Sequence, residues 1–241
     1  MKLKQALAAV AALACMSGAH AQSANTFYVT TGWFHFMPQD GSDPLKIDDV
    51  AGRSVNQAFP GTGAGIGTSD TLGFSLGYFI TDHLATEVEL GIPPKFDLNG
   101  EGSLGAYGKI GEAKLWSPAL IFKYYFNKPE AKFHPYVGLG VTHISFSDAK
   151  ITNQNFINSS ALGGPTSVST DSSWAPVFNV GFNYNFTKHW FAGFSLSYIP
   201  VSVIATLNTQ KETQVGTVSQ KAEAKIHLNP LVTYLKVGYM F

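Results

Sequence analysis

Hydrophobic and polar residues alternate with a period of two through much of the chain. The clearest stretch is 174–186, where even positions carry large apolar side chains such as Trp174 and Phe182, and odd positions carry polar ones such as Asn179 and Asn183. Successive side chains of a β-strand point to opposite sides, so this stretch has one apolar and one polar face. No run reaches the roughly 18 apolar residues that a spanning helix needs. The alternation therefore predicts an all-β protein.

Eight stretches show this pattern, and each is about as long as a tilted membrane strand. We expect strands at 26–37, 72–80, 84–92, 116–126, 136–146, 174–186, 190–198 and 231–241. Short connections fall at 81–83, 127–134 and 187–189, and long ones at 39–70, 94–115, 148–173 and 201–227. Because short and long connections alternate, an antiparallel meander places every long one at the same end. This predicts an eight-stranded antiparallel transmembrane β-barrel with long extracellular loops, and a soluble sandwich would lack the alternation.

Aromatic side chains gather near the two ends of the predicted strands. Tyr124, Phe126, Tyr184, Phe186, Trp190, Tyr239 and Phe241 lie toward the short turns, and Trp116, Trp174 and Tyr198 lie toward the long connections. Amphipathic rings prefer the headgroup level of a membrane. Rings that fill a soluble core are the alternative, but these rings occupy the outward faces of successive strands. The two girdles, and a last strand that stops on Phe241, indicate the outer membrane of a bacterial cell.

The first 21 residues have the pattern of a secretory signal peptide. Lys2 and Lys4 precede an apolar run and a cleavage site that ends at Ala21, so we expect the barrel to occupy residues 22–241. Cys15, the only cysteine, lies in this segment, and lipidation there is the alternative. Without Lys2 and Lys4, 14 of the 16 basic residues remain against 16 acidic ones, a net charge of about −2. That charge excludes a strong nucleic-acid-binding surface.

Four segments have a distinctive sequence: Lys132–Gly140, which reads KFHPYVGLG, the strand Ser117–Phe126, the stretch 174–190 and the closing Gly238–Phe241. Together they resemble the OmpW family of outer-membrane proteins. The resemblance covers residues from about 27 to 241 and is lost in the long connections, as expected for exposed loops. Met240 stands where the family often has a basic residue. The resemblance implies an eight-stranded barrel whose apolar channel passes small hydrophobic molecules, with a lateral exit through the wall as one route.

Four charged residues occupy inward-facing positions at similar heights above the short turns. They are Glu87, Glu89, Lys123 and Lys236. In a narrow interior of low dielectric constant, such charges must be paired and hydrogen-bonded. We expect them to form a layer that closes the axial route into the periplasm; the alternative is ordinary ion pairs that fill a small barrel and have no role in transport. The apolar contacts expected along the channel are Phe34, Phe36, Phe79, Ile121, Ile144 and Phe146.

Prolines mark the long-connection ends of the predicted strands. Pro38, Pro93, Pro118, Pro176, Pro200 and Pro230 all fall there. A proline has no N–H to donate to a strand ladder. Our hypothesis is that the upper wall is locally unzipped at these residues, so that apolar molecules leave the lumen sideways into the bilayer. The alternative is that proline is simply tolerated at strand ends.

Two functions from different classes fit this pattern. The first is a passive outer-membrane channel for small hydrophobic molecules, and the second is a surface interaction protein, such as an adhesin or a phage or toxin receptor, whose barrel anchors loops like 152–173. The histidines lack metal-ligand spacing, and the Gly-rich segment 61–67 lacks the spacing and the lysine of a phosphate loop. We therefore expect no enzyme, catalytic residue, cofactor or metal. We expect a monomer whose partners are outer-membrane lipid, small hydrophobic solutes and, through the last strand, the outer-membrane assembly machinery.

Overall fold

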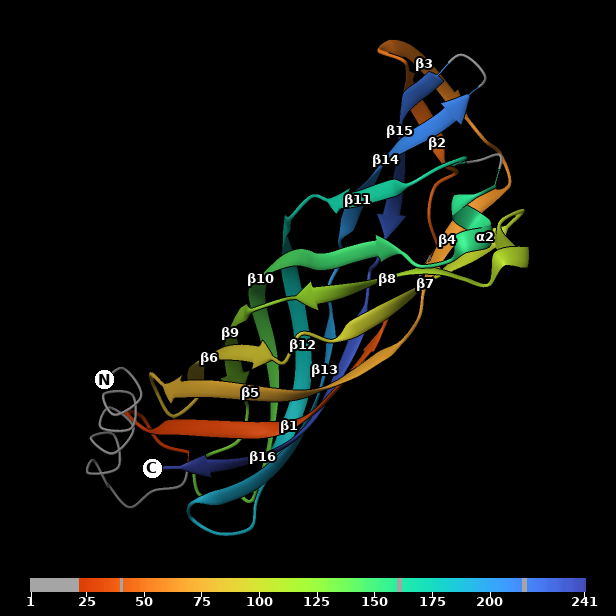
Figure 1. Ribbon diagram of the computed structural model, residues 1–241. Coiled ribbons are helices and arrows are strands. Elements are labelled where there is room, and N and C mark those ends of the chain that lie inside the picture. Colours follow the sequence, from red (N-terminus) through yellow and green to blue (C-terminus); the bar gives the residue numbers. More distant parts are fainter. Residues whose placement is uncertain (1–21, 40, 160–161, 214–215) are drawn as a thin grey trace, which may run out of the picture.

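The computed structural model describes residues 22–39, 41–159, 162–213 and 216–241 (Figure 1). The expected signal peptide, residues 1–21, lies outside the described residues. Eight antiparallel strands close a barrel in the order β1 (Phe27–Met37), β5 (Ser69–Phe79), β6 (Leu84–Gly91), β9 (Ala119–Tyr125), β10 (Phe133–Ile151), β12 (Ser173–Asn185), β13 (Trp190–Tyr198) and β16 (Leu231–Met240), and β16 pairs with β1. The predicted eight-stranded antiparallel barrel is confirmed.

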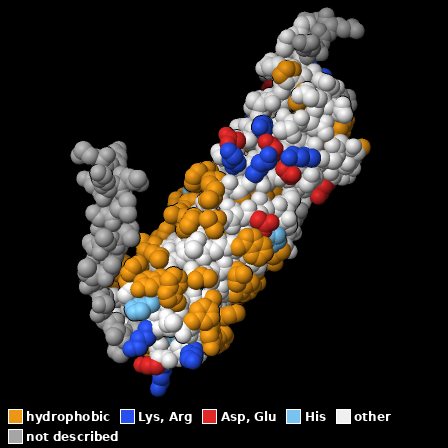
Figure 2. All heavy atoms as spheres, turned by 60° about the horizontal axis from the view of Figure 1, so that its bottom comes forward, with side chains coloured by type: hydrophobic (Ala, Val, Ile, Leu, Met, Phe, Trp, Pro, Cys, Tyr) orange, Lys and Arg blue, Asp and Glu red, His pale blue; other side chains and the backbone are white. Residues whose placement is uncertain are grey.

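The two faces of the barrel strands differ as the alternation predicts. Outward side chains form an apolar belt, seen on the face shown in Figure 2, and Trp174 in this belt is 70 % exposed. Inward neighbours such as Asn179 and Asn183 are almost fully buried. Apolar side chains exposed over so wide an area suit hydrocarbon and not water. The belt therefore marks the part of the barrel that lies in the bilayer.

Strands continue the wall above the belt, so the prediction of long loops is wrong for most of these residues. The upper strands are β2 (Lys46–Val50), β3 (Arg53–Ala58), β4 (Thr62–Ile66), β7 (Lys95–Gly102), β8 (Lys109–Trp116), β11 (Thr166–Thr170), β14 (Ser202–Thr213) and β15 (Gly216–His227). In β15, Ala222, Ala224 and Ile226 are buried, and the residues between them are charged and more exposed. The buried positions of this alternation hold mostly small side chains, and prolines separate β15 from the neighbouring barrel strands. For both reasons the strand pattern of β15 is weak in the sequence.

The upper strands form two groups (Figure 1). β4, β7 and β8 pair in that order and join the upper half of β10, whereas β11, β14, β15, β2 and β3 form a separate sheet. A 3-10 helix, η1 (Gly105–Tyr107), and a short helix, α2 (Gln154–Ile157), connect strands at this end. The Asn153 side chain accepts the N–H of Phe156 and so caps α2. No helix in the described part of the chain is long and apolar enough to cross a bilayer.

Three buried apolar clusters follow one another along the lumen. The lowest lies near the short turns, the middle one lies at the upper part of the barrel, and the highest lies inside the extended wall. Their members include Tyr28, Phe79 and Phe191 (lower cluster), Phe34, Ile121 and Val232 (middle cluster), and Leu104, Phe156 and Leu207 (upper cluster). The interior is therefore filled with side chains along much of its length, as expected for so narrow a barrel.

Candidate functional site

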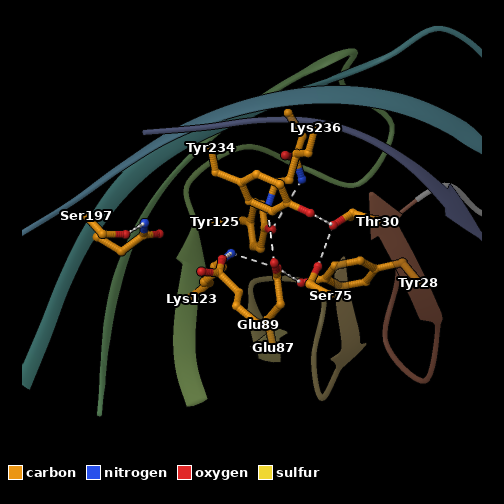
Figure 3. A network of polar contacts seen from close by, with 12 residues as sticks. Tyr28, Thr30, Ser75, Glu87, Glu89, Lys123, Tyr125, Ser197, Tyr234 and Lys236 are labelled. Carbon is orange, nitrogen blue, oxygen red and sulfur yellow. Dashed lines mark hydrogen bonds and ion pairs between the residues drawn. The ribbon is translucent and has the colours of Figure 1, made fainter. Parts of the chain in front are cut away.

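The structure brings Glu87, Glu89, Lys123 and Lys236 together inside the barrel (Figure 3). The Glu87 carboxylate oxygens lie 2.7 Å from Lys123 Nζ and 3.2 Å from Lys236 Nζ. Lys123 Nζ also lies 3.2 Å from a Glu89 oxygen. Glu87, Lys123 and Lys236 have fully buried side chains, and two negative charges face two positive ones. We call these four residues the charged layer.

The strand order explains how the charged layer spans the lumen. Glu87 and Glu89 lie on β6, and Lys123 lies on β9, which pairs with β6. Lys236 lies on β16, which is separated from β6 by β5 and β1 around the barrel. Alternation turns all four side chains inward, and the long lysine stems reach across the narrow interior. Whether the layer closes the axial route remains a prediction.

One hydroxyl group contacts the charged layer directly, and three others bond to one another in the same network of polar residues (Figure 3). Tyr28 donates its hydroxyl to Glu87 at 2.6 Å, and the Thr30 hydroxyl lies 2.9 Å from that of Tyr234 and also contacts Ser75. These residues were not singled out by the sequence analysis. Their inward positions follow from alternation, but the sequence does not show that Tyr28 reaches Glu87 or that the other three hydroxyls bond to one another. Hydrogen bonds to a buried carboxylate compensate part of its lost hydration.

The predicted apolar contacts divide between two clusters. Phe79 lies in the lower cluster, where its ring centroid is 5.3 Å from Tyr28 and 5.2 Å from Tyr125. The other five belong to or pack against the middle cluster: Phe34, Phe36, Ile121, Ile144 and Phe146. Because Phe79 is near the short turns, it is placed away from the cavity described next.

A cavity of about 250 Å³ lies beside the charged layer on the extracellular side. Its apolar lining includes Phe34, Phe36, Leu115, Val177, Ile199 and Val232. Glu89 is the one member of the charged layer among its lining residues. The side chain of Glu89 is 9 % exposed, whereas that of Glu87 is completely buried. The cavity is therefore mainly apolar and has a carboxylate on its boundary.

The barrel wall is interrupted beside this cavity. The ladder between β6 and β9 ends at the pair Glu89–Ala119, and the ladder between their continuations β7 and β8 begins at Lys95–Lys114. Between these rungs, residues 90–93 share no backbone hydrogen bond with residues 116–118, all of which are described. We call this interruption the seam gap. It is closed above by the N–H of Leu115, which donates to the carbonyl of Pro94.

Pro93 contributes directly to the seam gap. Ile92 donates its N–H to Leu72 on the neighbouring β5. Backbone groups of successive strand residues point to opposite edges, so Pro93 faces β8 and β9 and has no N–H to offer them. Leu90 and Trp116 line the cavity and are also 51 % and 50 % exposed on the barrel surface. The cavity therefore reaches the apolar belt at the seam gap.

Residues 24–241 match the OmpW family. The chain belongs to this family. Outer membrane protein W of Vibrio cholerae serotype O1 is 29 % identical to it over 99 % of this chain and 100 % of that protein. The dibenzothiophene metabolism operon protein PahQ of Pseudomonas aeruginosa is 25 % identical over 83 % of this chain and 86 % of that protein. The crystal structure of the outer membrane protein OprG from Pseudomonas aeruginosa has the same fold, with a TM-score of 0.78 and 24 % identity over 92 % of this chain and 98 % of that one.

Family membership places the chain in the outer membrane of Gram-negative bacteria, where the apolar belt contacts lipid. Above the charged layer the lumen of this chain is lined by the apolar middle and upper clusters. The lumen of this family member also holds the charged layer, so its apolar part does not extend to the short turns.

The structure places the six predicted prolines at different kinds of position. Pro93 and Pro118 flank the seam gap, although the Pro118 carbonyl accepts the N–H of His143 on its other side. Pro176 lies within the continuous ladder between β10 and β12, where it pairs with Val141. Pro200 follows the end of β13.

Pro38 and Pro230 lie where the wall is bridged. Met37 pairs with Leu231 in the last rung between β1 and β16. Pro38 comes directly after Met37 and Pro230 directly before Leu231, so both prolines lie just above this rung. Beyond them the N–H of Gln39 donates to the carbonyl of Leu228, and Pro230 itself accepts the N–H of Ile199. Pro93 and Pro118 at the seam gap therefore remain candidates for a lateral opening. Pro176 and Pro200 also remain candidates, because they lie beside a second interruption within the described part of the chain, where residues 172–177 share no backbone hydrogen bond with residues 199–203 between the pair Phe178–Tyr198 and the bond from the Asp171 N–H to the carbonyl of Ile204.

One arrangement of polar side chains was missed in the sequence. His227 Nδ1 lies 2.9 Å from the Ser202 hydroxyl, and its Nε2 lies 3.3 Å from an Asp43 oxygen. The three residues come from β14, β15 and the segment after β1, so their spacing in the sequence gives no signal. Their contacts join three neighbouring parts of the upper wall.

Proposed function

We propose that this OmpW-family barrel is a passive channel for small hydrophobic molecules that leave sideways into the bilayer. The observation that carries the proposal is the position of Leu90 and Trp116, which line the cavity and are half-exposed on the apolar belt. An apolar solute at this position has hydrocarbon on the outside of the seam gap. Transfer from water into hydrocarbon is favourable by about 25 cal/mol per Å² of apolar surface, so no energy source is needed.

Entry from the extracellular end is supported by the upper cluster. A small cavity of about 60 Å³ lies there, and its lining includes Leu104, Phe156 and Leu207. The larger cavity below it has about 250 Å³, which is slightly less than the roughly 300–1,000 Å³ of pockets for drug-sized ligands. These sizes favour small solutes.

The charged layer supports a lateral exit in preference to an axial one. An apolar molecule that passed between Glu87, Lys123 and Lys236 would separate ion pairs that are fully buried. Separating buried charges without compensation costs several kcal/mol. The seam gap requires no such separation, because no backbone bond crosses it.

The names of the relatives and the family resemblance support the solute class. PahQ is named for an operon of dibenzothiophene metabolism, and dibenzothiophene is an apolar aromatic compound. We extend that solute class to this chain as part of the proposal. We also propose that the chain acts as a monomer and that its last strand is bound by the outer-membrane assembly machinery, because β16 ends in an alternating apolar pattern.

Closing the seam gap tests the lateral route. Gly91 and Ser117 lie on its two sides, and a side chain added at Gly91 meets its nearest neighbour, Thr71, at an ordinary 3.5 Å. The described residues contain no cysteine, so the double variant Gly91→Cys/Ser117→Cys has two thiols available for a short bifunctional reagent. We expect cross-linking to reduce uptake of naphthalene into vesicles that contain the purified protein, and reduction of a cleavable linker to restore it.

The matched control links two strands whose ladder is already continuous. Val29 and Leu76 pair between β1 and β5 and are both exposed, so cross-linking Val29→Cys to Leu76→Cys should leave uptake unchanged. Uptake of a polar solute of similar size, such as glucose, should be low in every variant. Undiminished naphthalene uptake after complete cross-linking of the seam pair would refute a lateral route through the seam gap. Equal uptake of both solutes would refute the hydrophobic selectivity.

Surface recognition is the second candidate function. Every residue of β3 is exposed, and β3 lies at the tip of the extended wall in Figure 1. An exposed tip of this kind suits contact with another surface. Replacing residues 51–58 by a short turn separates the candidates, because it should abolish adhesion or phage binding and leave naphthalene uptake intact.

A further inference from the structure

A cluster of lysines and carboxylates lies on the outer surface directly above the apolar belt (Figure 2). It consists of Lys95, Asp97, Lys109, Glu112, Lys114, Asp148 and Lys150. These residues come from three adjacent strands, β7, β8 and β10. With four cations and three anions, the cluster has an excess of one positive charge. We call it the lysine cluster.

The height of the lysine cluster matches the headgroups of the outer leaflet. On β8, Lys114 lies two residues beyond Trp116, which is half-exposed at the upper edge of the belt. Two residues of a strand span about 7 Å, and less along the membrane normal when the strand is tilted. The long-connection end of the barrel is the extracellular one in this architecture. The ammonium groups therefore lie where the phosphates of outer-leaflet lipid begin.

The pairing of like charges inside the cluster favours an anion between them. Lys95 and Lys114 lie directly opposite each other in the ladder between β7 and β8. Like charges at this position destabilise a strand pair. The two ammonium groups turn to different carboxylates, because Lys95 binds Glu112 at 2.6 Å and Lys114 binds Asp148 at 2.8 Å.

A surface hollow separates these groups. It has a volume of about 360 Å³, and Lys95, Lys114 and Lys150 line it together with Glu112 and Asp148. The lysine side chains are 49–60 % exposed, whereas Glu112 is 16 % exposed beneath them. Each ammonium has three N–H donors, so the lysines retain donors for an acceptor in the hollow.

We propose that the lysine cluster binds the phosphate groups of an anionic glycolipid in the outer leaflet. The acyl chains of the lipid then lie on the belt below, where Ile92 and Trp116 are exposed. Lys95 follows Pro94, and Lys114 precedes Leu115, so the bound lipid covers the outer mouth of the seam gap. A role limited to tying β7, β8 and β10 together is the alternative. Ion pairs between strands are expected in either case. Exposed ammonium groups are needed only for lipid binding.

Native mass spectrometry of the purified full-length protein in neutral detergent tests this proposal without measuring transport. The probes are bisphosphorylated lipid A, its dephosphorylated form and inorganic phosphate. We expect the wild type to retain one bisphosphorylated lipid A and to bind the other two at least 10-fold more weakly. The triple variant Lys95→Gln/Lys114→Gln/Lys150→Gln should lose at least 10-fold in lipid A binding.

Two control variants keep the outcome decisive. Lys46→Gln/Lys221→Gln removes two partly exposed lysines that pair with Asp48 and Glu223 on the other sheet, and it should bind lipid A like the wild type. The triple Lys→Arg variant should also bind, because it keeps the charges and donors. If the triple Gln variant does not fold, Lys114→Gln alone should still lower binding several-fold.

Several outcomes would overturn the proposal. Equal binding by the Gln and wild-type proteins would show that the lysines only tie strands together. Equal binding of dephosphorylated lipid A would assign the contact to acyl chains. Binding of inorganic phosphate as tight as that of lipid A would make this a site for free anions. None of these results would affect the proposed uptake function, which depends on the seam gap.

Discussion

Glu87 is the residue on which the charged layer depends, and Glu87→Gln should destabilise the barrel strongly. Its carboxylate contacts Lys123 at 2.7 Å and Lys236 at 3.2 Å, and it accepts the hydroxyl of Tyr28 at 2.6 Å. In the variant, Lys123 keeps its contact with Glu89, whereas Lys236 loses the carboxylate that it pairs with in the described structure. One buried positive charge is then left without compensation.

The expected cost follows from this geometry. Removing one partner of a buried ion pair costs about 3–5 kcal/mol, because the other charge stays buried. Glu89→Gln should cost less, about 1.5–3 kcal/mol, since Glu89 makes one lysine contact at 3.2 Å and borders the cavity. Glu223→Gln is the surface control: its partner Lys221 is about half-exposed, and exposed pairs contribute about 0–1 kcal/mol.

Urea unfolding in lipid vesicles, followed by tryptophan fluorescence, measures these differences. The double variant Glu87→Gln/Lys236→Met removes the stranded ammonium and leaves the pair Lys123–Glu89. We expect it to recover most of the lost stability, with a coupling free energy of about 2 kcal/mol or more between the two sites. The reasoning is refuted if Glu87→Gln unfolds within 1 kcal/mol of the wild type, or if adding Lys236→Met makes the loss larger.

Three further predictions concern other parts of the molecule. Replacing Glu87, Lys123 and Lys236 together by alanine should raise ion conductance in planar bilayers, and unchanged conductance in a folded barrel would show that another barrier closes the axial route. Gly77→Ala should cost about 1–3 kcal/mol in the same urea assay and shift the tyrosine absorbance, because a methyl group at Gly77 overlaps the Tyr28 ring that contacts Glu87. Gly105→Ala is the control, because Gly105 has no positive φ and an added Cβ there meets its nearest neighbour only at 3.9 Å. Lys95, Lys150 and Lys109 hold the pKa of Glu112 at about 2. Its ion pairs therefore stabilise the fold fully at pH values above the ordinary carboxyl pKa of about 4.3, and this stabilisation is lost as the pH falls through 2. An NMR titration in which the Glu112 carboxyl protonates near pH 4 would contradict this.

The barrel and its inward charges could be predicted because both follow from a period of two. Once the outward face of each strand is known, Glu87, Lys123 and Lys236 must point inward. Their similar distances from the short turns are then enough to place them at one level. In the structure the three side chains do lie at one level, because Glu87 contacts both Lys123 and Lys236.

The upper wall was less predictable because its signals are weak or nonlocal. The alternation of Ala222, Ala224 and Ile226 in β15 is carried by small side chains and follows a region without clear pattern. The seam gap lies between the end of the β6–β9 ladder and the start of the β7–β8 ladder. Where each ladder ends is set by the pairing register of residues that are far apart in the sequence. Pro230 and Pro93 look alike in the sequence, because each simply marks the end of a predicted strand. The neighbouring backbone decides that the wall at Pro230 is bridged and that Pro93 faces an interruption.

The charged layer and the seam gap meet at one residue, and this connects the two halves of the proposed path. Glu89 belongs to the charged layer, lines the cavity and forms the last rung of the β6–β9 ladder with Ala119. The next residue, Leu90, already lies in the seam gap. A molecule that stops at the charged layer is therefore level with the place where backbone hydrogen bonds between the two strands end. If the charged layer lay one rung lower, the proposed axial barrier and the proposed lateral exit would no longer be at the same level. The position of Glu89 therefore defines the proposed route more closely than the positions of the prolines do.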